Sequence, residues 1–158
     1  MPIAQALPIN TGATALQMAN AIFGTGVTVS SATYSGDPLS SGIYSNGDTI
    51  SPGVVPGDTG VIMSTGFVTD FTNNSGTTNT NVSGSTGSNT TGINFDTDFN
   101  ALAGRNTFDA AFLEVEFTPA GDFITVDFVI GSDEYPEFVT STFLETVGVW
   151  VNGVEGTV

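Results

Sequence analysis

Residues 113–130 read LEVEFTPAGDFITVDFVI, and this stretch decides the fold class. The run from Leu113 to Phe117 alternates apolar with acidic residues, and a second alternating run extends from Ile124 to Ile130. The PAGD sequence at 119–122 separates the two runs and is rich in turn-forming residues. Because successive side chains of a strand point to opposite faces, the pattern predicts a β-hairpin with one buried face.

Shorter strand patterns lie on both sides of this hairpin. Residues 27–30 alternate valine with threonine and serine, residues 60–64 form a short apolar run, and residues 147–151 read VGVWV. Asn152-Gly153 follows the last run and is the strongest two-residue hairpin signal in the chain, so a return strand is expected from Val154. A sheet that ends there leaves an unpaired edge, so we expect either a longer domain or a partner, such as a second copy, that supplies the missing strands.

One helical pattern stands near the start of the chain. Residues 13–23 carry apolar side chains at helical spacing, Thr11 or Thr14 is placed to cap the helix, and Gly24 is placed to end it. With 158 residues we expect one domain, residues 1–158. The predicted fold is all-β, a sandwich or jelly roll with one short N-terminal helix and an incomplete C-terminal edge.

Residues 69–92 differ in composition from the rest, since 21 of the 24 residues are Ser, Thr, Asn or Gly. Such a segment buries too little apolar surface to offset the entropy lost on ordering, which predicts a long surface loop. The alternative is a threonine-rich recognition surface for sugar or ice. The irregular spacing of the threonines favours the loop.

The charge balance excludes several functions. The chain has 16 acidic residues, one basic residue, and neither histidine nor cysteine, with a formal net charge of −15. It cannot present a basic surface to nucleic acid, and an anionic membrane surface repels it. Histidine acid–base chemistry, thiol chemistry and Cys/His zinc sites are likewise excluded. No apolar run is long enough for a membrane span, so we expect no membrane insertion.

The first candidate metal site is the sequence Asp96-Thr97-Asp98-Phe99-Asn100. Oxygen-bearing side chains at positions 1, 3 and 5 resemble the start of a calcium loop, and Asp109 is close enough in sequence to contribute. Ala101 replaces the EF-hand glycine, so an EF-hand is excluded. The structural alternative is that Asp96 or Asp98 caps a short helix.

The second candidate combines Asp133, Glu134 and Glu137 directly after a predicted strand. Carboxylates packed this closely repel one another unless they are solvated, protonated or bridged by a cation, so we weigh a calcium site against a solvated acidic loop. A catalytic pair for glycoside hydrolysis, Glu134 with Glu137, is the weakest interpretation because any acidic loop offers two carboxylates.

Aromatic residues supply a further hypothesis, since Tyr135, Trp150 and Tyr34 are candidate stacking surfaces for a sugar. The alternating strand around Trp150 favours a core position for its ring. Arg105, the only cation, is interpreted as the partner of an acid such as Asp98 or Asp109.

The sequence also resembles the bacterial choice-of-anchor L domain. The resemblance rests on GTGVTVSSATYSGD (24–37), GVIMSTG (60–66), DTDFNALAG (96–104), NTFDAAFLEVEFTPAGD (106–122) and GSDEYPEFV (131–139). It implies an extracellular or cell-surface bacterial protein and no established enzymatic activity. The family usually continues past the strand at 147–151, and it commonly has an Asn-Asp pair where this chain reads FLET (143–146).

Together these observations predict a non-enzymatic, secreted or cell-surface module of the adhesin or matrix type, stabilised by calcium. The alternatives are a carbohydrate-binding module, a self-assembling extracellular subunit and, less favoured, a glycoside-active enzyme.

Overall fold

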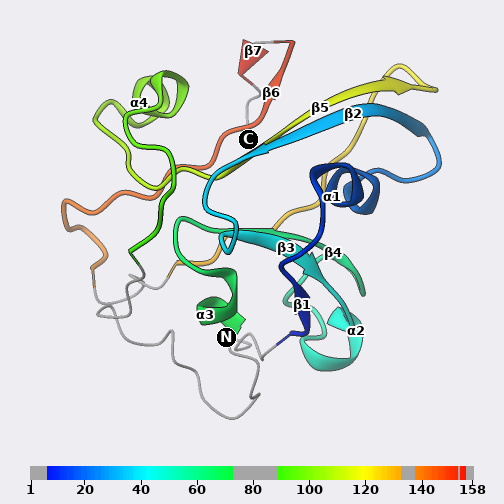
Figure 1. Ribbon diagram of the computed structural model, residues 1–158, viewed down its shortest axis with the longest axis horizontal. Coiled ribbons are helices and arrows are strands. Elements are labelled where there is room, and N and C mark those ends of the chain that lie inside the picture. The colour runs from blue at the N-terminus through cyan, green and yellow to red at the C-terminus, as the bar shows by residue number, and fades with distance from the viewer. Residues whose placement is uncertain (1–6, 73–88, 133–137, 153, 156–158) are drawn as a thin grey trace.

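The computed structural model describes residues 7–72, 89–132, 138–152 and 154–155. Strands outnumber helices, which establishes a β-rich fold (Figure 1). In chain order the elements are β1 (Ile9–Asn10), α1 (Ala15–Ile22), β2 (Val27–Ser35), β3 (Ser41–Tyr44), α2 (Gly47–Ile50), β4 (Gly60–Met63), α3 (Val68–Thr72), α4 (Thr97–Ala103), β5 (Phe112–Pro119), β6 (Trp150–Val151) and β7 (Val154–Glu155). They form three antiparallel sheets in the orders β1-β3-β4, β2-β5 and β6-β7.

The longest ladder pairs β2 with β5, from Val27 opposite Pro119 to Ser35 opposite Phe112. The predicted alternation of β5 is confirmed, because its apolar residues are half-buried and Glu114 and Glu116 are exposed. A register shift between Val29 and Ser31 marks a bulge in β2.

The predicted hairpin partner of β5 was wrong. Residues 123–130 form no strand, and all of them are exposed. The N–H of Ala120 donates to the carbonyl of Gly26 at 2.8 Å, so the chain leaving β5 continues along β2 instead of turning back at Pro119. β2 is a partner of matching length, and it forms hydrogen bonds along one edge of β5 from Phe112 to Pro119.

The strand β3 lies at the centre of the second sheet, between β1 and β4. The sequence did not predict this strand, which lies in a turn-rich stretch, although it is mostly buried. A Cβ on Gly42 would lie 2.6 Å from Ile9 Cγ2 and 2.9 Å from the carbonyl oxygen of Asn10, so only glycine allows β1 to approach. The predicted strand at 60–64 is confirmed as β4.

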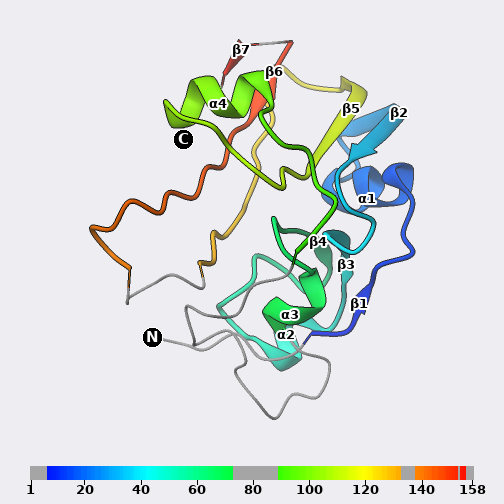
Figure 2. The ribbon, with the colours of Figure 1, turned by 60° about the vertical axis from the view of Figure 1, so that its left-hand side comes forward.

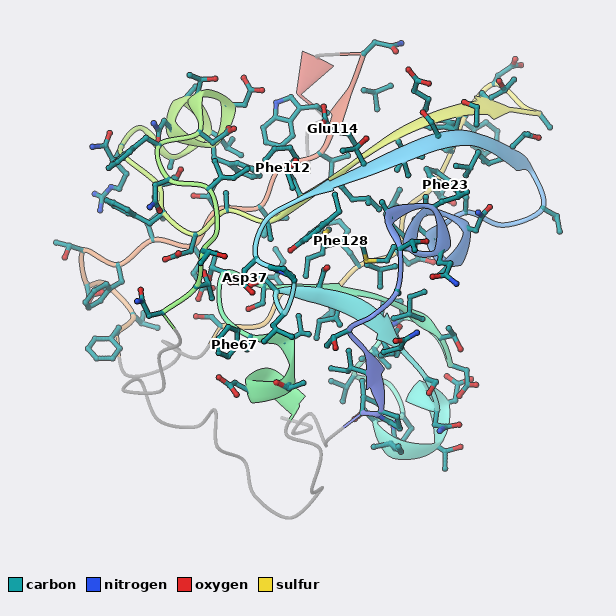
Figure 3. The ribbon with its side chains drawn as sticks, in the orientation of Figure 1. Phe23, Asp37, Phe67, Phe112, Glu114 and Phe128 are labelled. Carbon is teal, nitrogen blue, oxygen red and sulfur yellow. The ribbon has the colours of Figure 1, made fainter. Side chains whose placement is uncertain are left out.

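The helix α1 confirms the predicted helical segment. Thr14 caps it through a reciprocal pair of bonds, in which Gln17 N donates to Thr14 Oγ1 at 3.3 Å and Thr14 N donates to Gln17 Oε1 at 2.8 Å. Met18 and Ala19 are buried. Phe23, which follows the helix and is labelled in Figure 3, packs on Phe117 of β5 with ring centroids 4.8 Å apart. The helix contacts strands of both larger sheets, and its buried face therefore contributes to the core between them (Figure 1).

The C-terminal hairpin is confirmed in its turn and its return strand, but the predicted strand at 147–151 is shortened to the two residues of β6. Trp150 pairs with Glu155 and Val151 pairs with Val154, around a turn in which Asn152 has a φ of 52°. A positive φ at this position is what a two-residue hairpin turn requires. The predicted Ser/Thr/Asn/Gly-rich loop at 69–92 lies mostly outside the described residues, and its first residues belong to α3.

Candidate functional site

The described residues after the Ser/Thr/Asn/Gly-rich stretch pair with the segment that leads into β5. Ile93 and Ala110 form a bridge, with N to O distances of 3.2 and 2.9 Å, and Phe95 N donates to Thr107 O at 2.8 Å. A Cβ on Gly92 would lie 2.6 Å from the Cα of Asp109, so the two backbones approach as closely as glycine permits. This contact brings two threonines, Thr90 and Thr91, next to two aspartates from different parts of the chain.

Asp37 is the first of these aspartates, and the residue is 7% exposed. Its Oδ2 accepts hydrogen bonds from the backbone N and the hydroxyl of Thr91, both at 2.8 Å, and its Oδ1 accepts one from Leu39 N at 2.9 Å. These bonds, with the Thr91 N–H as the largest cause and the Leu39 N–H next, lower the pKa of Asp37 below its ordinary value. The carboxylate is therefore ionised at neutral pH and is fixed by three donors.

The turn that carries Asp37 depends on Gly36, which has a φ of 149°. A Cβ there would lie 2.6 Å from the Tyr34 hydroxyl and 3.0 Å from the Cα of Ala111. That hydroxyl donates to the carbonyl oxygen of Asp37 at 2.8 Å. Burial raises the pKa of Tyr34, and the charge of Asp37 adds to the rise, so the phenol stays protonated as a donor. The end of β2 thus holds the carboxylate in one orientation.

Asp109 is the second aspartate. Its Oδ1 accepts a bond from Thr90 Oγ1 at 2.8 Å, and its own N–H donates to Asn94 Oδ1 at 3.0 Å. Its φ of 55° is unusual for a residue other than glycine, and the two bonds help to hold that conformation. We name Asp37, Thr90, Thr91 and Asp109 the carboxylate–threonine network. It joins the end of β2 to the segment before β5, and its member Asp37 is labelled in Figure 3.

The network is poorly suited to acid–base catalysis. A carboxylate with a lowered pKa is a weak base and is not protonated near neutral pH, so Asp37 cannot serve as a general acid there. Three fixed donors also leave it little freedom to move toward a substrate. The arrangement therefore favours a structural role or a contribution to cation binding.

The predicted metal ligands of the first site have separate roles in the structure. Asp96 caps α4, because its Oδ1 accepts from Asp98 N at 3.0 Å and from Phe99 N at 3.1 Å. This confirms Asp96 as the N-cap, one of the two residues that the structural alternative named. Asn100 Oδ1 accepts from the N and the hydroxyl of Thr107 at 2.6 and 3.0 Å. Asp98 is exposed in the first turn of α4.

Within the described ranges, no three acidic side chains gather closely enough to suggest a metal ion. The second predicted metal site, Asp133, Glu134 and Glu137, and the predicted stacking residue Tyr135 lie outside the described residues. Calcium binding at either loop therefore stays a prediction.

Trp150 and Arg105 each contact a residue that is distant in sequence. Trp150 is half-buried and packs edge-to-face on Phe99, with ring centroids 5.3 Å apart, which agrees with the core position favoured for it. The predicted pairing of Arg105 with Asp98 or Asp109 was wrong for these two described acids, because the exposed guanidinium donates from Nη1 to the carbonyl oxygen of Thr142 at 2.6 Å. Its guanidinium thus helps to connect the end of α4 to the segment before β6.

Sequence reasoning missed the network itself. Gly36-Asp37-Pro38 was interpreted only as a turn, and Thr90 and Thr91 only as the end of a polar loop. The signal that was available is the position of Asp37 directly after an alternating strand, where a short acidic side chain can accept backbone N–H groups. Its distant partner Thr91 carries no such local signal.

Comparison with known proteins adds a family assignment to this geometry. The sequence profile of the choice-of-anchor L domain matches residues 8–158. The chain belongs to the choice-of-anchor L domain family. The resemblance seen in the sequence is therefore confirmed over nearly the whole choice-of-anchor L chain, and it indicates a surface-associated, extracellular bacterial module. Neither a curated protein nor a solved structure matches the chain. No helix in the described part of this choice-of-anchor L domain is long and apolar enough to cross a membrane.

Proposed function

We propose that this choice-of-anchor L chain is a non-enzymatic, secreted or cell-surface module of the adhesin or matrix type, and that calcium stabilises its folded state. The observation that carries the proposal is 16 acidic residues against one basic residue in a domain of an extracellular family. One guanidinium cannot balance that charge, so cations from the medium must do so. Extracellular fluids supply calcium, a hard cation that prefers carboxylate and carbonyl oxygens.

The proposed mechanism is structural. Calcium bridges carboxylates in the loop from Asp96 to Asp109 and in the Asp133–Glu137 segment, and so removes part of the repulsion between them. The bonds from Phe95 N to Thr107 O and from Asp109 N to Asn94 Oδ1 close the first loop at its base. An ion there would recruit one or two carboxylates together with carbonyl or water oxygens.

The finer architecture belongs to the same proposal. We infer a sandwich in which the β1-β3-β4 and β2-β5 sheets are the two layers. Its support is that α1 contacts strands of both sheets and that the described core residues Met18, Ala19 and Tyr44 come from α1 and β3. The adhesin or matrix role rests on the family and on the absence of histidine and cysteine chemistry from the sequence.

Thermal unfolding with calcium and with a chelator tests the calcium proposal. Magnesium and sodium at equal ionic strength serve as controls, because screening alone stabilises a polyanion in any salt. With calcium at about 100 times its dissociation constant the stabilisation is about 2.7 kcal/mol. For a domain of this size that is roughly a 5–10 °C rise in Tm. Equal midpoints in calcium and magnesium would remove the calcium proposal.

Two variants sharpen that experiment. Asp109→Asn removes one charge from the proposed loop, and Asp122→Asn removes one from the exposed turn after β5. We expect the first to reduce the calcium-specific rise in Tm and the second to leave it unchanged. An equal effect of both would assign the rise to general charge neutralisation. Hydrolysis of chromogenic glycosides that is lost in both Glu134→Ala and Glu137→Ala would overturn the non-enzymatic assignment.

A further inference from the structure

The peptide bond between Asp37 and Pro38 is the one Asp–Pro bond of the chain, and two donors converge on its carbonyl group. The carbonyl oxygen of Asp37 accepts hydrogen bonds from the Tyr34 hydroxyl at 2.8 Å and from Ser40 N at 2.9 Å. A carbonyl oxygen has two lone pairs, so these two donors satisfy it fully. Donors at such distances stabilise the negative charge that develops on the oxygen when the carbonyl carbon is attacked. The carbonyl of Asp37 is therefore held as in an oxyanion hole.

The carboxylate of the same residue is a nucleophile next to this carbonyl. Its Oδ1 accepts a hydrogen bond from Leu39 N at 2.9 Å, and Leu39 follows the Asp37–Pro38 peptide group. This bond holds the side chain alongside that peptide group, as in an Asx turn. Thr91 fixes Oδ2 through two further bonds of 2.8 Å. Because the carboxylate and the carbonyl carbon belong to one residue, attack requires no movement toward a second molecule.

Pro38 supplies the leaving group of such an attack. Its nitrogen carries no hydrogen and belongs to a tertiary amide. Asp37 and Ser40 are buried, whereas Pro38 is exposed. The carbonyl side of the bond is thus held inside the protein by fixed donors, and the departing amine takes its proton from solvent.

We propose that the folded chain cleaves its own Asp37–Pro38 bond. In the first step a carboxylate oxygen of Asp37 bonds to the carbonyl carbon of the same residue, the bond from that carbon to Pro38 N breaks, and the nitrogen takes a proton from solvent. In the second step one water molecule opens the cyclic anhydride of Asp37 to two carboxyl groups. The net reaction is hydrolysis of one peptide bond by one water. It occurs once in each chain, so it is self-processing and involves no external substrate.

The ionisation states at the bond suit this reaction in mild acid. The hydrogen bond from Thr91 N is the main cause that lowers the pKa of Asp37, so the carboxylate stays ionised where solvent protons for the leaving nitrogen are more abundant. The titratable side chain that donates to Asp37 is Tyr34, and burial raises its pKa, so the phenol remains a donor. The donors weaken the carboxylate as a nucleophile, but its fixed position beside the carbonyl offsets that loss. We therefore expect cleavage to be faster in mild acid than at neutral pH.

The two pieces stay assembled after cleavage. Residues 1–37 contain β2 and residues 38–158 contain β5, and these strands lie side by side in one ladder (Figure 2). Phe23 of the first piece also packs on Phe117 of the second. Cleavage therefore leaves the fold in place and gives the module a new amino terminus at Pro38. The pieces separate only under denaturing conditions, which determines how the reaction is detected.

Denaturing mass spectrometry measures cleavage of the full chain in a mildly acidic buffer in which circular dichroism shows it folded, and in the same buffer with urea. We expect pieces 1–37 and 38–158, whose masses add up to the intact chain plus one water, to form at least tenfold faster in the folded protein. The unfolded chain keeps the Asp–Pro bond but loses the donors on its carbonyl. No cleavage, or cleavage as fast in urea, overturns the proposal. Both buffers contain chelator, so the result does not depend on the proposed calcium sites.

Three variants test the residues involved. Tyr34→Phe removes one donor from the carbonyl of Asp37 and should slow cleavage at least tenfold, since loss of one oxyanion donor typically costs about 10²–10³-fold in rate. The matched control is Tyr44→Phe on β3, where the ring lies against Gly60, and it should leave the rate within twofold. Equal slowing by both would overturn the role of Tyr34. Asp37→Ala should leave the bond intact over the same period, and continued cleavage would overturn the role of its carboxylate as nucleophile.

Discussion

Gly92→Ala tests the close backbone contact between Gly92 and Asp109 on which the carboxylate–threonine network depends. The new Cβ would lie 2.6 Å from the Cα and carbonyl carbon of Asp109, and ordinary contact begins near 3.4 Å. The two backbones must therefore separate by about 0.8 Å. Backbone strain does not contribute to the expected loss of stability, because Gly92 has no positive φ. The cost comes from the close approach alone.

That separation is large enough to break the bridge next to Gly92. The bonds between Ile93 and Ala110 have N to O distances of 3.2 and 2.9 Å, and a further 0.8 Å takes both beyond hydrogen-bond length. A net loss of about 0.5–1.5 kcal/mol for each bond gives roughly 1–3 kcal/mol. The same range is typical of overpacking, about 1–3 kcal/mol. We therefore expect Gly92→Ala to lower the free energy of unfolding by about 2 kcal/mol.

Urea denaturation at fixed calcium, salt and protein concentration measures the loss. Gly26→Ala is the matched control, because a Cβ there meets nothing within 4 Å and Gly26 has no positive φ. Its stability should stay the same or rise by up to about 1 kcal/mol, since alanine restricts the unfolded chain. If Gly92→Ala were as stable as Gly26→Ala, the contact between Gly92 and Asp109, and with it the network, would be refuted.

Three further predictions concern caps and titration. Asp96→Ala should cost about 1 kcal/mol by removing the acceptor for two N–H groups of α4, whereas Asp98→Ala should cost less because its side chain is exposed; urea midpoints of the two variants check this. Thr14→Ala should cost about 1 kcal/mol through loss of the capping box on α1, again measured by urea denaturation. The pKa of Asp37 is lowered in the folded state. Its contribution to stability is therefore present above the ordinary aspartate pKa and is lost as the pH falls through the lowered value. Asp37→Asn should remove this dependence and flatten the acid side of a plot of urea midpoint against pH. An unchanged acid limb would show that Asp37 does not have the described donors.

Elements whose signals are local could be predicted from the sequence. Thr14 lies three residues before the Gln17 that completes its capping box, and Asn152-Gly153 specifies its own hairpin turn. Asp96 likewise caps a helix that begins at the next residue. In each case the deciding hydrogen bonds join residues a few positions apart, so a short window of sequence contains all the information.

Pairing over long distances could not be predicted in this way. The alternation of β5 was correct, yet its partner β2 lies about 85 residues away, as the bond from Ser31 Oγ to Glu116 Oε2 shows. A nearby alternating run at 124–130 looked like an equally good partner, because period alone does not choose between two strands. The sequence did not predict β3 for another reason. Its burial depends on polar and small residues such as Ser41 and Gly42, which no hydrophobic pattern marks.

The carboxylates of this choice-of-anchor L domain reveal how so acidic a chain can order its loops. With one guanidinium in the chain, the acids must find other donors. Asp37 and Asp96 accept backbone N–H groups, Asp109 accepts a threonine hydroxyl, and Glu116 accepts the hydroxyl of Ser31. Neutral donors satisfy the hydrogen-bonding capacity of a carboxylate but leave its charge in place.

The hydrogen bonds that fix single carboxylates and the electrostatic repulsion from the net charge are therefore separate effects in this protein. Threonine side chains fix individual carboxylates, which accounts for a defined structure around Asp37 and Asp109. The remaining charge of −15 still acts between loops and between copies of the chain. It follows that monovalent salt should raise the free energy of unfolding by screening this repulsion, whereas calcium should raise it further than magnesium at equal ionic strength. That difference separates calcium binding from general charge screening in one set of measurements.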